Sequence, residues 1–74
     1  MARIDRLEQK EPGRTSVHAA VDATYQVFEL DGAIYLQIDT YGSSDRQFRG
    51  KVSQSVQFGP EGIAALREIL SSLR

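Results

Sequence analysis

Apolar and polar residues alternate over two stretches of this chain, and the alternation predicts its strands. From Thr15 to Val27 the larger apolar side chains fall on odd positions with polar residues between them, and the stretch runs on to Leu30. A repeat of two residues is typical of a β-strand with one buried face. Because most strands are about five or six residues long, we expect a break near residues 22–24.

Asp31-Gly32 predicts a tight hairpin turn after this strand. Both central residues of a type I′ turn need positive φ, which Asp and Gly tolerate, and a two-residue loop fixes the register of the flanking strands. The expected pairs are Leu30 with Ala33, Phe28 with Tyr35, Val27 with Leu36, Gln26 with Gln37 and Tyr25 with Ile38. One face then carries Tyr25, Val27, Ile34, Leu36 and Ile38, and the other carries Gln26, Phe28, Tyr35, Gln37 and Asp39.

The C-terminal part predicts one more strand and a helix. Residues 42–50 lack periodicity and indicate a long loop, whereas residues from Lys51 to Phe58 alternate again. Gly59-Pro60-Glu61 is typical of a helix start, because proline in the first turn lacks only an N–H that would be unpaired there. An apolar stripe follows, which we expect to cover the apolar face of the sheet: it consists of Ile63, Leu66, Ile69, Leu70 and Leu73.

The expected fold is therefore α+β, an antiparallel meander of three to four β-strands followed by one C-terminal α-helix packed on the sheet. Residues 15–74 form this single domain. Residues 1–14 are rich in charge and end at a Pro12-Gly13 breaker, so we expect a flexible N-terminal arm there.

Composition removes several classes of function. The chain has 74 residues and 8.2 kDa, with no Cys and a single His. Disulfides, thiolate nucleophiles and sulfur-containing zinc sites are thus excluded. No apolar run approaches the ~20 residues of a membrane helix, and no signal-peptide core is present, so we expect a cytoplasmic protein without membrane contact. So small a domain buries little surface by itself, which favours a homodimer.

No pattern points to catalysis, a cofactor or a metal. His18 has neither a second His nor a Cys beside it, and we interpret it as a surface residue. Asp39 and Asp45 are too few carboxylates for a hard metal ion and fit loop-capping roles. Ser43 and Ser44 precede no general base at a known spacing and fit a turn. We therefore expect a protein that is not an enzyme.

The face opposite the predicted core combines aromatic rings with amide and hydroxyl groups. Phe28 and Tyr35 form a cross-strand pair on it. The surrounding side chains are Gln26, Gln37, Ser53, Ser55 and Gln57. Such a face can stack on and hydrogen-bond to the bases of single-stranded nucleic acid, and it can equally form a subunit interface.

The distribution of charge bears on this choice. The net charge is −1, so attraction to nucleic acid has to be local. Arg46, Arg49 and Lys51 surround Phe48 in the predicted loop, an arrangement expected of phosphate contacts beside a stacking ring. A solvated loop is the alternative interpretation.

From Thr15 to Arg74 the order of elements resembles the positive-cofactor-four family of transcriptional coactivators, which has small bacterial members. The resemblance rests on the Asp31-Gly32 hairpin, the basic loop and the strand ending at Gly59-Pro60-Glu61. It implies a homodimer formed through the helix and a sheet that binds single-stranded DNA. Family members carry Lys and Arg on their DNA-facing strands, whereas this chain has Asp22, Glu29 and Asp39. The residues that carry over are Lys51, Arg46 and Arg49, with Tyr35 and Phe28 as stacking platforms.

The segment from Gln37 to Arg46 also resembles small bacterial proteins of unassigned activity. Together these patterns predict a small protein that binds single-stranded DNA or RNA, as a cofactor in transcription or DNA metabolism. The alternative is a protein–protein interaction module, a homodimeric adaptor whose same face and arm engage a protein partner without nucleic-acid binding.

Overall fold

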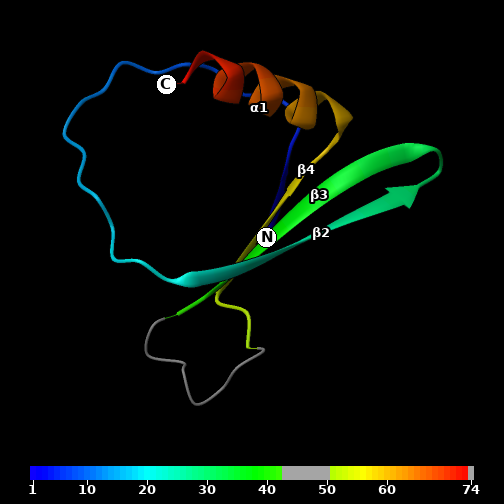
Figure 1. Cartoon of the computed structure of the whole chain (residues 1–74), viewed down its shortest axis with the longest axis horizontal. Coiled ribbons are helices and arrows are strands. Elements are labelled where there is room, and N and C mark those ends of the chain that lie inside the picture. The colour runs from blue at the N-terminus through cyan, green and yellow to red at the C-terminus, as the bar shows by residue number, and fades with distance from the viewer. Residues whose placement is uncertain (43–50, 74) are drawn as a thin grey trace.

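The structure is a computed structural model that describes residues 1–42 and 51–73. A four-stranded sheet with the order β1-β4-β3-β2 is followed by one C-terminal helix on one side of it (Figure 1). The strands are β1 (Ala2–Ile4), β2 (Asp22–Leu30), β3 (Ala33–Tyr41) and β4 (Gln54–Phe58), and the helix is α1 (Pro60–Ser72). The expected α+β class and the C-terminal helix are thus confirmed.

The hairpin of β2 and β3 has the register that its turn predicts. Asp31 and Gly32 both adopt positive φ, and Leu30 pairs with Ala33 on the first rung. All five expected pairs occur, because a two-residue turn leaves no freedom to slip. The assignment of side chains to the two faces therefore holds as well.

The sheet is mixed, so the expectation of a purely antiparallel meander is wrong. β4 pairs antiparallel with β3, but its other edge pairs in parallel with β1 inside the segment expected to be a free arm. A three-residue strand shows no periodicity, and a parallel partner far along the chain gives no local signal. The rest of that segment, residues 5–14, contains neither helix nor strand.

The long strand expected from Thr15 begins only at Asp22. Asp22 pairs with Tyr41, the last residue of β3, so residues 15–21 have no strand beside them. Without a neighbouring strand, residues 15–21 do not form a strand despite their alternating pattern, and Val17 is almost fully exposed. The break expected near residues 22–24 therefore marks the start of the strand.

The apolar core is small and lies where α1 leaves β4. Phe58 is the single large apolar side chain that is buried in the described part of the chain, at 9% exposure. Ile63 and Leu66 in the first half of the helix are half-buried, but Ile69, Leu70 and Leu73 are exposed. The expected coverage of the apolar face is thus only partly right, because α1 starts at one end of the sheet and runs away from it (Figure 1).

Candidate nucleic-acid interface

The polar face of the sheet, which is the face that α1 does not cover, is built from registered rows of side chains on β2, β3 and β4. Its central rows are Phe28 with Tyr35, then Gln26 with Gln37 and Gln57, then Thr24 with Asp39 and Ser55, and Asp22 with Tyr41 follows. Because residues paired across strands share a face, these side chains form one continuous surface.

An aromatic pair occupies the hairpin end of the polar face. The rings of Phe28 and Tyr35 are stacked, with centroids 5.4 Å apart and an angle of 16° between their planes. Such a pair contributes about 0.5–1.5 kcal/mol beyond the area it buries. Both side chains are half-buried, so part of each ring remains open to a ligand.

A chain of hydrogen bonds crosses the middle of the polar face. Gln57 Nε2 donates to Gln37 Oε1 over 2.9 Å, and Gln37 Nε2 donates to Asp39 Oδ1 over 3.0 Å. Ser55 Oγ donates to the same Asp39 oxygen over 2.7 Å. These bonds fix which edge of each amide faces outward, so the face presents a defined pattern of donors and acceptors.

A third aromatic residue, Tyr41, lies at the other end of the polar face. It follows Asp39 by two positions on β3, and its hydroxyl lies 3.0 Å from Thr24 Oγ1. Sequence reasoning did not include Tyr41 or Thr24 among the site residues. The parity that grouped Tyr35, Gln37 and Asp39 would have found Tyr41 had the strand been extended to its last residue.

Among the described residues, Arg3 is a cationic residue in register with the polar face, and Lys51 precedes β4 in the sequence. Arg3 pairs in register with Gln57 at the β1 edge, and its guanidinium forms an ion pair with Asp5, with 3.0 Å between Nη2 and Oδ2. Lys51 is exposed and lies just before β4. Arg3 was missed as a site residue because the strand that positions it has no sequence signal.

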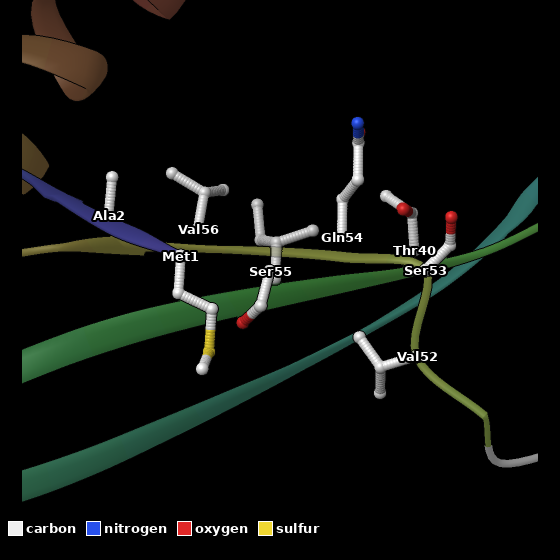
Figure 2. A pocket seen from close by; sticks show the side chains of 9 residues that line it. Met1, Ala2, Thr40, Val52, Ser53, Gln54, Ser55 and Val56 are labelled. Atoms are coloured by element: carbon white, nitrogen blue, oxygen red, sulfur yellow. The ribbon is translucent and has the colours of Figure 1, made fainter.

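The structure brings together five of the predicted site residues and separates others. Phe28, Tyr35, Gln26, Gln37 and Ser55 share the polar face. Ser53 does not join them: β4 begins only at Gln54, and Figure 2 shows the Ser53 side chain on the side of Thr40 and Gln54, opposite to Ser55. Arg46, Phe48 and Arg49 lie outside the described residues.

An open hollow of about 550 Å³ lies at the β1–β4 end of the sheet (Figure 2). Ala2, Ile38 and Val56 give it an apolar floor, and Thr40, Ser53 and Gln54 line its polar side. None of the side chains lining it is charged. With this largely apolar floor, the hollow resembles an uncovered part of the core.

Two other kinds of feature, a metal-type cluster and a membrane-spanning helix, are absent from residues 1–42 and 51–73. There, no three His, Cys, Asp or Glu side chains gather as a metal site would require. The helix that the structure describes is too short and too polar to cross a membrane. No family model matches the chain, and no curated protein or solved structure matches it.

Proposed function

We propose that this protein is a non-enzymatic single-stranded nucleic-acid-binding protein that uses the polar face. The observation that carries the proposal is the continuity of this face: stacked Phe28 and Tyr35 lead into a hydrogen-bonded row of Gln37 and Gln57, and no helix or strand of the described residues covers either. Aromatic rings next to amides suit unpaired bases, because every base has a π-face and polar edges.

The expected phosphate contacts lie at the border of the face. Lys51 is exposed just before β4, and the neighbouring Arg46 and Arg49 add positive charge in the sequence, although they lie outside the described residues. A strand that stacks on the polar face would have its phosphates directed to this border, because Asp39 in the middle repels them. The resemblance to the positive-cofactor-four family points the same way.

The proposal includes a homodimer in which a second copy covers the apolar side of the sheet. Tyr25, Val27 and Ile34 on the sheet and Leu70 on the helix are each more than half exposed. A standard interface buries about 800 Å² on each partner, which this surface can supply.

Binding can be tested with a labelled oligonucleotide of about 15 nucleotides in a salt titration that starts at about 50 mM. Tyr35→Ala should weaken binding by about 1–3 kcal/mol without changing the salt slope, because a stacking contact is lost. Replacing Arg49 and Lys51 together by Ala should flatten the slope by up to about two units, because two phosphate contacts are lost.

Matched controls separate these effects from damage to the fold. Tyr35→Phe keeps the ring and should bind like the parent, and Arg67→Ala removes an exposed cation from α1 and should leave the slope unchanged. We expect duplex of the same sequence to bind less well than single strand. If the parent binds no oligonucleotide at low salt, nucleic-acid binding is wrong.

A protein–protein adaptor is the second candidate function, and one observation favours it. Two carboxylates lie on the polar face of the β2–β3 hairpin, Asp39 and the Asp22 that pairs with Tyr41, and both oppose contact with phosphate. A protein partner would accept this face without that repulsion. Failure of oligonucleotide binding combined with an intact dimer would favour the adaptor.

A further inference from the structure

Asp39 holds an unusual position for a carboxylate. It is half-buried in the middle strand of the polar face, with Thr24 as its neighbour on β2 and Ser55 as its neighbour on β4. The ion pairs formed by the described residues are Arg3 with Asp5 and Arg6 with Glu8, so none of them neutralises it. A carboxylate in such a place is stabilised by hydrogen-bond donors.

Only one of its two oxygens receives such donors from the described residues. Oδ1 accepts bonds from Gln37 Nε2 and Ser55 Oγ, which use both of its lone pairs. Oδ2 accepts none from a described side chain. The network therefore fixes the carboxylate and leaves one oxygen able to accept hydrogen bonds from a ligand.

The aromatic ring of Tyr41 lies on the same face as the Asp39 carboxylate. Tyr41 is two residues further along β3 on the same face, about 7 Å away along the strand. It is half-buried, and the Thr24 contact at 3.0 Å holds its hydroxyl. A planar ligand that stacks on Tyr41 would thus bring its edge toward Asp39.

We propose that Asp39 and Tyr41 form a nucleobase site that accepts bases with an exocyclic amine and disfavours uracil and thymine. The inference rests on the proposed nucleic-acid binding and adds a base preference to it. The amine of cytosine or adenine can donate to Asp39 Oδ2. Uracil and thymine carry a carbonyl oxygen where cytosine carries its amine. Their ring N–H lies between two carbonyl oxygens, and the Asp39 carboxylate repels both of these oxygens.

The test compares oligodeoxycytidine with oligodeoxyuridine, each of about 15 nucleotides, at neutral pH and low salt. These two polymers have the same backbone and similar rings, and their bases differ in the donor and acceptor pattern. A hydrogen bond from a neutral amine to a charged carboxylate corresponds to about a tenfold preference for cytidine, which fluorescence anisotropy measures directly.

Two variants assign the preference to Asp39. Asp39→Asn keeps an oxygen for Gln37 and Ser55 but removes the charge and adds an N–H donor, so the preference should fall to about one, mainly through tighter binding of uridine. Asp31→Asn makes the same isosteric change in the hairpin turn, a position where Asn tolerates positive φ, and should keep the preference.

The outcomes test the base preference separately from the proposed nucleic-acid binding. Equal binding of both polymers by the parent would overturn the base site while leaving nucleic-acid binding intact, and so would a preference that survives Asp39→Asn. A carboxylate can also accept from a ribose hydroxyl. If oligouridine RNA binds more tightly than its deoxy form and Asp39→Asn removes that difference, Asp39 contacts the sugar and the base assignment is wrong. Failure of every polymer to bind would reject both proposals.

Discussion

Asp31 and Gly32 adopt φ values of 53° and 81°, a region that most side chains avoid. Together they reverse the chain within two residues and fix the pairing of β2 with β3. The same pairing decides which residues share the polar face. The two residues therefore determine which side chains form the candidate site, because they set the register of β2 with β3.

Replacing Gly32 by Val should lower the free energy of unfolding by about 1 kcal/mol or more, because a β-branched residue resists positive φ. A Cβ at this position meets no atom within 4 Å, so crowding does not contribute. Chemical denaturation measures the change. Gly13→Val is the matched control, since Gly13 has equally open surroundings and no positive φ, and its stability should stay near the parent's. Equal stability of Gly32→Val and the parent would show that the turn is wrongly assigned.

At the scale of elements, the short edge strand β1 contacts the start of α1. The Gly59 N–H donates to the Ile4 carbonyl over 3.1 Å just before the helix begins. Gly62, in the first turn, lies so close to the same carbonyl that a methyl group there would overlap it. The Asp5 carboxylate also lies against Gly59, near the positive end of the helix dipole. β1 is thus held by the helix start as well as by β4.

Gly62→Ala tests the contact between β1 and α1 through the sign of the change in the free energy of unfolding. In an isolated helix the change would stabilise by about 1 kcal/mol, because alanine has the higher helix propensity. Here we expect a loss of about 1 kcal/mol or more, since the methyl group forces β1 and α1 apart.

Urea denaturation gives the sign, and amide exchange gives the location, because the Gly59 N–H should lose protection with its bond to Ile4. Gly13→Ala, in open surroundings, is the control and should change neither. A more stable Gly62→Ala protein would show that β1 does not dock on the helix start.

At the scale of the whole molecule, two surfaces with different chemistry lie on opposite sides of one sheet. On the side of α1, apolar side chains such as Tyr25 and Val27 remain exposed at 75% and 61%. On the other side, polar side chains bond to one another and leave a patterned surface. The apolar surface suits a permanent protein partner, and the polar face suits a ligand that binds reversibly.

If the proposed homodimer forms, Val27→Glu should convert it into a monomer, because the variant places a charge in the middle of the surface that we propose a second copy covers. Val27 is largely exposed, so the fold of each copy should survive. Gln26→Glu adds the same charge at the next position of β2, on the polar face, and should leave the dimer intact.

Sedimentation equilibrium over a range of protein concentrations reads out the mass of each variant. A parent that stays monomeric on concentration would reject the dimer. Dissociation by Gln26→Glu instead of Val27→Glu would place the interface on the polar face and leave no room there for nucleic acid.

The sequence by itself determined the hairpin, its register, the division of β2 and β3 into two faces, and the start of α1. Each of these depends on neighbouring residues: a turn that requires positive φ at Asp31 and Gly32, a period of two, and a proline at the beginning of a helix. Local rules of this kind act on the chain wherever it lies in the fold, so they can be read without knowing the fold.

The tertiary structure alone decided the pairing of β1 with β4, the loss of strand structure before Asp22, and the exposure of the second half of α1. It also decided that Ser55 and Gln37 converge on one oxygen of Asp39 and that Ser53 does not join them. These features depend on which segments lie beside one another. An alternating stretch becomes a strand only where a second strand supplies partners for its backbone, and the pattern of one segment carries no record of whether that partner exists.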